Sequence, residues 1–321
     1  MRWGRSVLME LMLFDSKRKA KGYFHGSLDM EIGDSSTTND FVSTDTSLSD
    51  GMYLVELNEE WGGIVEKMGD YVSEYEWSGH TWRGLLQQCI IEPPEGEDYL
   101  VMSGDINEII GTVTANMLGG FFTPSTIKCG VSAEKYRFKR YCTGLDGLMD
   151  LCAEYGCKLV IRNVIRDERL SIELSAERRL TYGQDAGVST VSFTVSRMGI
   201  NHLICAASGE LADRTIVHLY LWPDGSIKQS PYYTGFEERT ALYSYTSEQD
   251  LTELIKEGKE KLLELASYRK MEISVSNEAI DIGDIAYATR NGVTVSQPVI
   301  RKILSFNNGN YNIEYKIKGA E

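Results

Sequence analysis

Hydrophobic positions in the last fifty residues alternate with polar ones, which is the period of a β-strand with one buried face. The alternation is clearest at Ile313, Tyr315 and Ile317. Two tight turns are predicted in this region, at Asn291-Gly292 and Asn308-Gly309, because Asn-Gly readily adopts the positive φ angles of a hairpin. The chain is therefore predicted to close with a β-meander.

The first hundred residues carry short apolar or alternating runs, separated by clusters of Gly, Ser, Asn and Asp. Such spacing is typical of an all-β barrel or sandwich. One helix is predicted as an insert at about 79–92, where apolar residues recur at helical spacing, and it ends before Pro93-Pro94 because proline cannot continue a helix. We assign residues 1–103 to a β-barrel domain with this helical insert.

From Gly104 the hydrophobic period changes to that of helices. A first helix is predicted after Asp105, whose carboxylate suits the N-cap position. A second helix begins near Gly144 and ends at Gly156, and two antiparallel strands follow it. Residues 104–183 are therefore predicted to form an α+β module.

The remaining chain returns to strand periodicity, interrupted by an amphipathic helix at about 247–268. Gly258 is expected to weaken the middle of this helix by about 1 kcal/mol relative to alanine. Residues 184–321 are assigned to a second β-barrel domain. The predicted fold class is thus α+β and β-rich, with two small, tube-like β-barrel domains, an α+β module between them, and one helix before the C-terminal meander.

Charge and hydropathy limit the partners of the chain. Its 321 residues include 33 Lys and Arg against 47 Asp and Glu, a formal net charge of -14, whereas binding to a phosphate backbone needs clustered cations. The basic run Lys17-Arg18-Lys19 with Lys21 is predicted to be a solvated hairpin tip. No apolar run approaches the roughly 18 residues of a membrane span, and Glu10 interrupts the N-terminal apolar run. We expect synthesis in a cytoplasm, without a signal peptide or membrane insertion.

Cysteines offer little metal chemistry. Cys152 and Cys157 have a C-x4-C spacing, but no second CxxC or HxxxH motif completes a zinc set. Cys152 lies on the apolar face of its predicted helix and is interpreted as a core thiol. All six cysteines are expected to be buried and reduced: Cys89, Cys129, Cys142, Cys152, Cys157 and Cys205.

Catalytic motifs are absent from the sequence. It contains neither G-x-S-x-G nor HExxH, and the loop 118–124, LGGFFTP, lacks the Lys-Ser/Thr of a phosphate loop. This loop is predicted to cap a helix at Gly119. The histidines and the paired acids are interpreted as structural or solvated: His25, His80, His202, His218, Glu59-Glu60, Glu74 with Glu76, and Glu237-Glu238. We therefore predict no enzyme, no catalytic residues, no cofactor and no metal.

An aromatic segment leaves several interpretations open. Tyrosine and phenylalanine gather between residues 232 and 245. They are expected to pack on a strand face, but such rings also stack on sugars or cover a subunit surface. The rings concerned are Tyr232, Tyr233, Phe236, Tyr243 and Tyr245.

Several segments together resemble one protein family. The chain is similar to the tail-tip hub proteins of long-tailed phages and prophages, which are related to the baseplate hub of contractile phages and to the N-terminal hub module of tail-associated lysins. In that family a strand ends in a Gly-Asp pair, here Gly283-Asp284, and a hairpin and a last pair of strands complete a small barrel. The segments that carry the resemblance are 71–91, 104–118, 138–162, 201–220 and 281–318.

The resemblance implies a structural protein of the virion tail tip. Three copies would form a ring that continues the tail tube, with a distal tail protein or the tube above and a fibre, spike or lysin protein below. DNA would pass through the lumen without specific binding, which suits the acidic charge. Two other functions stay open: a carbohydrate- or receptor-binding module of the virion, motivated by the tyrosines, and a peptidoglycan hydrolase that uses an unrecognised carboxylate pair.

Overall fold

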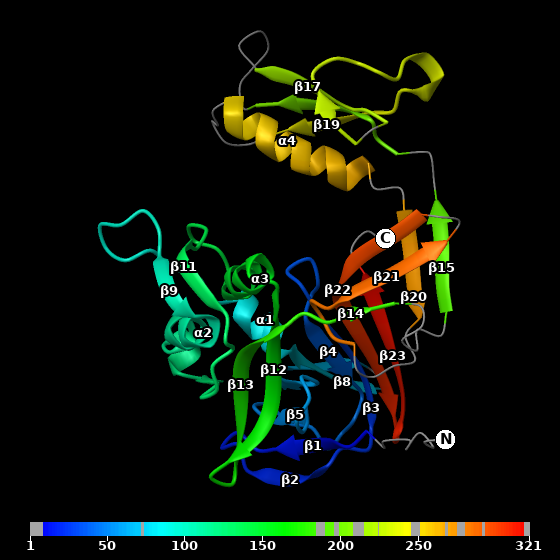
Figure 1. Ribbon diagram of the computed structural model, residues 1–321. Coiled ribbons are helices and arrows are strands. Elements are labelled where there is room, and N and C mark those ends of the chain that lie inside the picture. Colours follow the sequence, from blue (N-terminus) through cyan, green and yellow to red (C-terminus); the bar gives the residue numbers. More distant parts are fainter. Residues whose placement is uncertain are drawn as a thin grey trace. The chain divides into compact units, whose positions relative to one another are not determined.

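The computed structural model describes residues 9–71, 74–183, 190–195, 199–207, 215–223, 225–244, 251–266, 269–274, 280–290 and 293–317. Contacts between the residues divide the chain into two units. Unit 1 comprises residues 1–190, 273–289 and 296–318, and unit 2 comprises residues 191–272, 290–295 and 319–321. Figure 1 shows the course of the chain through both units.

Unit 1 begins with the β-rich region that the hydrophobic pattern predicts. A four-stranded sheet has the order β2-β1-β5-β6, and the largest sheet has the order β14-β21-β22-β3-β4-β8-β7, with β23 paired to β22. The strands of the first sheet are β1 (Leu11–Phe14), β2 (Ala20–Tyr23), β5 (Tyr53–Glu56) and β6 (Gly62–Ile64). Those of the second are β3 (Ser27–Gly33), β4 (Asp40–Ser43), β7 (Lys67–Tyr71), β8 (Glu74–His80), β14 (Thr181–Tyr182), β21 (Ile285–Arg290), β22 (Val293–Asn307) and β23 (Asn310–Ile317).

Strands β22 and β23 belong to the same sheet as β3 and β4, which lie far earlier in the sequence. Strand β22 pairs antiparallel with β3, in a register that sets Arg301 opposite Gly33 and Asn307 opposite Ser27. The turn predicted at Asn308-Gly309 joins β22 to β23, and both residues have positive φ, 48° and 84°. That hairpin is confirmed, whereas Asn291-Gly292 lies outside the described residues.

Helices and a long hairpin form the rest of unit 1. The three predicted helices are α1 (Trp82–Gln87), α2 (Ile106–Thr114) and α3 (Gly144–Glu154). They share a core with the hairpin of β12 (Cys157–Arg166) and β13 (Arg169–Arg178). The other elements here are β9 (Val101–Asp105), a 3-10 turn at Met117–Gly119, β10 (Phe122–Pro124) and β11 (Ser132–Arg137).

Polar caps explain where these helices begin. The Asp105 carboxylate accepts a hydrogen bond from the backbone N–H of Asn107 at 3.0 Å, so the predicted N-cap of α2 is confirmed. The Thr81 and Thr143 side chains are the N-caps of α1 and α3, and each accepts a hydrogen bond from a backbone N–H of the first turn. Helix α3 stops before Gly156, whose φ of +67° is the left-handed conformation that ends helices.

Unit 2 pairs one helix with one sheet. The sheet has the order β18-β17-β16-β19, and α4 packs on it through Leu254 and Leu262; Figure 1 shows this helix along the sheet. The elements are β16 (His202–Ala206), β17 (Ile216–Leu221), β18 (Ile227–Lys228), β19 (Thr240–Ser244) and α4 (Leu251–Ala266), and β15 (Thr190–Val195) pairs with β20 (Arg269–Ser274).

The predicted fold class, α+β and β-rich, is confirmed. The described strands form open sheets, and no closed barrel is found among them. The division into three domains at residues 103 and 183 stays a prediction.

Candidate functional site

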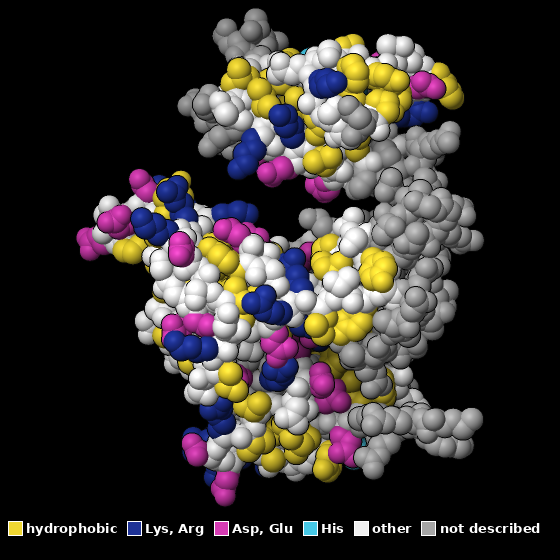
Figure 2. Space-filling model, viewed as in Figure 1, with side chains coloured by type: hydrophobic (Ala, Val, Ile, Leu, Met, Phe, Trp, Pro, Cys, Tyr) yellow, Lys and Arg dark blue, Asp and Glu magenta, His cyan; other side chains and the backbone are white. Residues whose placement is uncertain are grey.

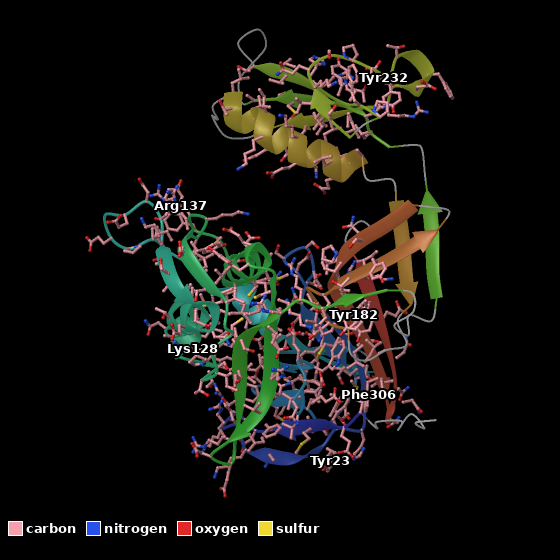
Figure 3. The ribbon with its side chains drawn as sticks, viewed as in Figure 1. Tyr23, Lys128, Arg137, Tyr182, Tyr232 and Phe306 are labelled. Carbon is pink, nitrogen blue, oxygen red and sulfur yellow. The ribbon has the colours of Figure 1, made fainter. Side chains whose placement is uncertain are left out.

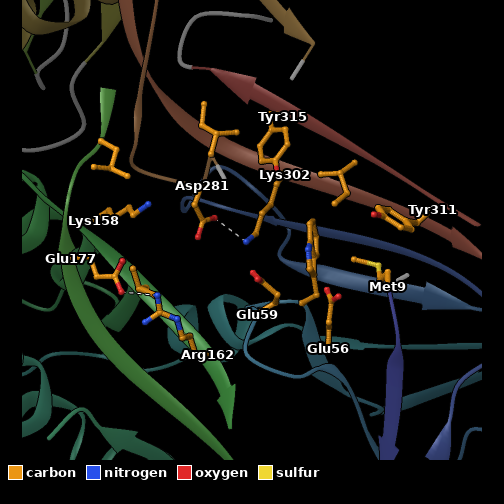
Figure 4. A pocket seen from close by; sticks show the side chains of 15 residues that line it. Met9, Glu56, Glu59, Lys158, Arg162, Glu177, Asp281, Lys302, Tyr311 and Tyr315 are labelled. Carbon is orange, nitrogen blue, oxygen red and sulfur yellow. Dashed lines mark hydrogen bonds and ion pairs between the residues drawn. The ribbon is translucent and has the colours of Figure 1, made fainter. Parts of the chain in front are cut away.

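A charged cavity of about 320 Å³ lies in unit 1, beside the strands β12, β13, β22 and β23. Its wall carries four acidic and three basic side chains, and Figure 4 shows them directed toward one another. The charged residues of the wall are Glu56, Glu59, Glu177, Asp281, Lys158, Arg162 and Lys302; the others are Met9, Trp61, Val160, Leu180, Ile280, Tyr311, Ile313 and Tyr315.

A buried ion network lies behind this wall. Lys302, on β22, is 4% exposed, and its ammonium group lies 2.9 Å from an Asp281 carboxylate oxygen and 3.2 Å from a Glu60 oxygen. The two oxygens of the Glu60 carboxylate also accept hydrogen bonds from the Arg83 guanidinium of α1, Oε1 at 2.5 Å and Oε2 at 3.3 Å. Arg83 also donates to the carbonyl of Leu159 on β12. Glu60 thus joins the first helix of the chain to its closing strands.

The turn that carries Glu60 is held by a single asparagine. Asn163, on β12, is fully buried, and its side-chain amide donates to the carbonyls of Glu56, Glu59 and Trp61. The Lys302 ammonium also lies over the Trp61 ring, 4.8 Å from its centre. The turn therefore has little freedom to move Glu60 away from its two cations.

Opposite charges fix the protonation of this network. Burial opposes the charged form of Lys302, but Asp281 and Glu60 raise the pKa of its ammonium group above the ordinary value. Burial alone would raise the pKa of Asp281, yet the facing Lys302 lowers it. A nucleophilic lysine needs a lowered pKa, so this amine is held in its unreactive, protonated form.

Glu59 behaves differently from its neighbour. The residue is exposed as a whole, but partial desolvation in the cavity wall raises the pKa of its carboxyl group. A hydrolytic pair needs a second carboxyl group at a suitable distance, and Glu60 and Asp281 are both engaged by buried cations. The arrangement is suited to holding chain segments together.

Acidification is expected to destabilise unit 1 through Asp281. Its pKa in the folded chain is below the unfolded value of about 3.9. The stabilisation is therefore complete above about pH 4 and is lost as the pH falls through the lower, folded pKa. Urea unfolding at pH 7 and pH 3 should show a smaller difference for Asp281→Asn than for the unchanged chain. Equal pH dependence of the two proteins would contradict this role.

The Gly283-Asp284 pair singled out by the sequence forms a second clamp. Asp284 is fully buried and accepts hydrogen bonds from the Lys158 ammonium at 2.7 Å and from the backbone N–H of Leu180 and Asp281 at 2.9 and 3.0 Å. Gly283 has a φ of +92°, and a Cβ here would lie 2.6 Å from the Cβ of Lys158. Only glycine fits this approach.

The position of that pair corrects one expectation. The resemblance implied that Gly283-Asp284 ends a strand, whereas the two residues form a turn immediately before β21. The reason lies in Asp284, whose carboxylate folds back onto the N–H of Asp281 and thereby closes the turn.

The other acidic pairs are not brought together as catalytic dyads. Glu60 was expected to be solvated but is 3% exposed and paired, because two cations from distant segments compensate its burial. Glu237 is exposed, and Glu238 lies 2.7 Å from the Nδ1 atom of His202. The side chain of Glu74 lies outside the described residues.

Histidines occupy structural or exposed positions. His202 is buried on β16, its Nε2 atom is 2.8 Å from the Nδ1 atom of His218, and its ring stacks on Tyr220. Burial lowers the pKa of His202, although Glu238 opposes the shift. His25 is exposed, and His80 contacts Glu66 at the surface.

The 118–124 loop, the basic run after β1 and the aromatic cluster around Tyr232 were also interpreted from the sequence. The helix cap expected at Gly119 is not found there: α2 ends at Thr114 with Ala115 as its C-cap, and Gly119 is the last residue of the 3-10 turn that follows. Gly120, with a φ of 77°, caps that turn. The basic residues 17–19 form the tip between β1 and β2, whereas Lys21 lies on β2. In this tip Asp15 accepts hydrogen bonds from two backbone N–H groups. The centre of the Tyr232 ring lies 5.0 Å from the ring centres of both Trp222 and Tyr233, and the residue is half exposed. Tyr245 lies outside the described residues.

The described residues offer neither a metal site nor a membrane-spanning helix. None of them form a group of three or more His, Cys, Asp or Glu side chains suited to a metal ion. No described helix is long and apolar enough to cross a membrane. On the face seen in Figure 2, Lys and Arg side chains are interspersed with Asp and Glu.

Comparison with known proteins finds similar structures but no similar sequence. No family model matches the chain, and no curated protein matches its sequence. It is similar to a tail protein from Neisseria meningitidis (TM-score 0.47, 12% identity, 96% of each chain covered). It is also similar to the 43 kDa tail protein of prophage MuSo2 from Shewanella oneidensis (TM-score 0.48, 11% identity, 96% of this chain and 98% of that chain covered).

A third similar structure is the prophage tail protein gp18 from Listeria monocytogenes (TM-score 0.46, 13% identity, 96% of this chain and 95% of that chain covered). Chains of the activated phage P2 baseplate match with TM-scores of 0.38 and 0.41. These structures are described as a tail protein, prophage tail proteins and the phage P2 baseplate.

Proposed function

We propose that this chain is a non-catalytic hub of a phage or prophage tail tip. Three copies form a ring that continues the tail tube and anchors distal fibre, spike or lysin proteins. The observation that carries the proposal is the closing hairpin β22–β23, which lies in the segment of strongest family resemblance and shares one sheet with β3. This pairing joins residues 27–33 to residues 301–307 in one sheet, on which a ring of copies can be assembled.

The largest sheet also offers an edge for a neighbouring copy. Among the described strands, β7 pairs only with β8. Met68, on that edge strand, is 50% exposed. An edge strand presents unpaired backbone groups that a second chain can extend, so we assign β7 to the junction between subunits.

Light scattering of the purified full chain tests the ring. We expect three times the chain mass at high concentration, and three copies around the tube axis in images of tail tips. Met68→Lys should weaken the trimer, because a lysine on an edge strand discourages pairing. Val101→Lys, at an equally exposed position on β9, should not.

Two outcomes would contradict the proposal at different levels. A chain that stays monomeric at high concentration and is absent from purified tail tips would remove the hub function. A trimer that withstands Met68→Lys would remove only the assignment of β7.

The aromatic cluster of unit 2 supports a second candidate, a glycan- or receptor-binding module. Tyr232, labelled in Figure 3, is 52% exposed beside Trp222 and Tyr233, and Phe236 is 90% exposed. Exposed rings provide platforms for sugars. Binding of the chain to host cell-wall glycans should be lost in Tyr232→Ala with Tyr233→Ala and kept in Tyr141→Ala, a similarly exposed tyrosine of unit 1. Absence of binding across a glycan panel would remove this function.

A further inference from the structure

Two cysteines far apart in the sequence lie in contact in unit 1. The Sγ atoms of Cys129 and Cys157 are 3.8 Å apart. Cys129 lies in the loop between β10 and β11 and is half buried, whereas Cys157 is the first residue of β12 and is fully buried. Cys129 is therefore the partly exposed member of the pair, and the buried Cys157 is in contact with it.

The backbone on both sides of the pair is firmly held. The Asp105 carboxylate accepts hydrogen bonds from the N–H groups of Cys129 and Gly130, at 3.0 and 2.8 Å. On the other side, the carbonyl of Cys157 accepts a hydrogen bond from the Arg179 guanidinium at 2.9 Å. The two sulfurs thus stay neighbours, and side-chain rotation has to close the distance from 3.8 Å to the roughly 2.05 Å of a disulfide.

We propose that Cys129 and Cys157 are a modification site, at which a low-molecular-weight disulfide such as oxidised glutathione converts the two thiols into an intramolecular disulfide. The crosslink forms when the protein leaves a reducing cytoplasm, where thiols are kept reduced. It goes beyond the hub function, since it does not depend on assembly.

The reaction is balanced by two thiol–disulfide exchanges. The Cys129 thiolate attacks one sulfur of oxidised glutathione, a mixed disulfide forms, and one glutathione thiolate leaves. The Cys157 thiolate then attacks the Cys129 sulfur of that mixed disulfide and releases the second glutathione. The protein loses two electrons and two protons, and glutathione gains both.

The contact between the two sulfurs and the partial exposure of Cys129 distinguish this pair from the buried Cys152. Cys152 is 1% exposed inside the core, and burial strongly raises the pKa of its thiol. Burial, and then the adjacent Cys129, raise the pKa of Cys157 to about 11. Because the thiolate is the reacting form, we expect the crosslink to form faster as the pH rises above neutral.

The position of the site gives the crosslink a mechanical effect. Cys157 immediately precedes Lys158, which pairs with the buried Asp284. A bond from Cys129 would therefore tie the loop held by Asp105 to the strand that carries this clamp. It would close a loop of roughly thirty residues and so restrict the unfolded chain.

Peptide mapping of the full chain tests the proposal. Reduced protein is treated with oxidised glutathione at pH 8.5, digested without reductant and analysed by mass spectrometry. We expect a Cys129–Cys157 linked peptide, loss of two of the six thiols, and an unfolding temperature raised by about 5 °C. Dithiothreitol should reverse all three changes.

Single substitutions provide the controls. Cys129→Ser should prevent the crosslink, and Cys142→Ser, at the other half-buried cysteine, should leave it intact. In Cys157→Ala, glutathione should remain attached to Cys129. If treated wild-type protein keeps six free thiols, retains glutathione on Cys129, or links Cys129 to Cys152, the proposal is overturned; mapping of the wild type decides this even if a variant fails to fold.

Discussion

Replacing Glu60 by glutamine is expected to lower the free energy of unfolding of unit 1 by about 3–5 kcal/mol, the usual cost of removing one partner from a buried ion pair. The substitution keeps the size of the side chain but removes the charge between Arg83 and Lys302. Both cations are at most 4% exposed, so bulk water compensates little of the lost charge. Lys302 would retain Asp281, whereas Arg83 would retain only neutral acceptors.

Urea unfolding followed by tryptophan fluorescence measures this effect, because Trp61 and Trp82 are buried in unit 1. Glu108→Gln serves as a matched control, since Glu108 pairs with Lys128 where both side chains are more than half exposed. Exposed pairs contribute at most about 1 kcal/mol. If the two substitutions cost the same, the network around Glu60 does not stabilise the fold.

Replacing Asp284 by alanine is expected to cost a comparable amount, about 3–5 kcal/mol. The change leaves the Lys158 ammonium, 7% exposed, without its carboxylate. It also leaves the N–H groups of Leu180 and Asp281 without their acceptor. An unsatisfied buried donor adds about 1–3 kcal/mol of desolvation cost.

Hydrogen exchange can locate the effect of Asp284→Ala. The amides of Leu180 and Asp281 should lose protection before those of the β12–β13 hairpin. Asp150→Ala is the control, because Asp150 pairs with Lys139 at the surface. Unchanged protection at both amides, together with a small loss of stability, would show that the Gly283-Asp284 turn is held by other contacts.

Local signals in the sequence predicted much of the secondary structure. The N-cap at Asp105, the stop at Gly156 and the turn at Asn308-Gly309 each depend on a few adjacent residues. Their conformations follow from side-chain capping and from the φ angles that Asn and Gly allow. Such features need no knowledge of the rest of the fold.

Features that join distant segments were not predicted. In the sequence, Glu60 resembles a solvated acidic residue of a turn. Its burial depends on Arg83, 23 positions away, and on Lys302, 242 positions away. Gly258 was interpreted as a weak point of its helix, yet a Cβ there would lie 2.5 Å from the Cys205 sulfur. The glycine therefore lets α4 approach the sheet. Neither the ion network nor this close packing produces a periodic pattern of hydrophobic residues in the sequence.

The pairing of β22 with β3 has a consequence for biosynthesis. Glu31 and Arg301, which form an ion pair across these strands, are 270 positions apart. While the ribosome is still making the chain, β3 has no partner on that side, and an unpaired strand is prone to associate with other polypeptides. The sheet is completed only after residues 293–317 have been synthesised, so folding is expected to be slow. Chaperone binding should favour nascent chains that still lack the β22–β23 hairpin.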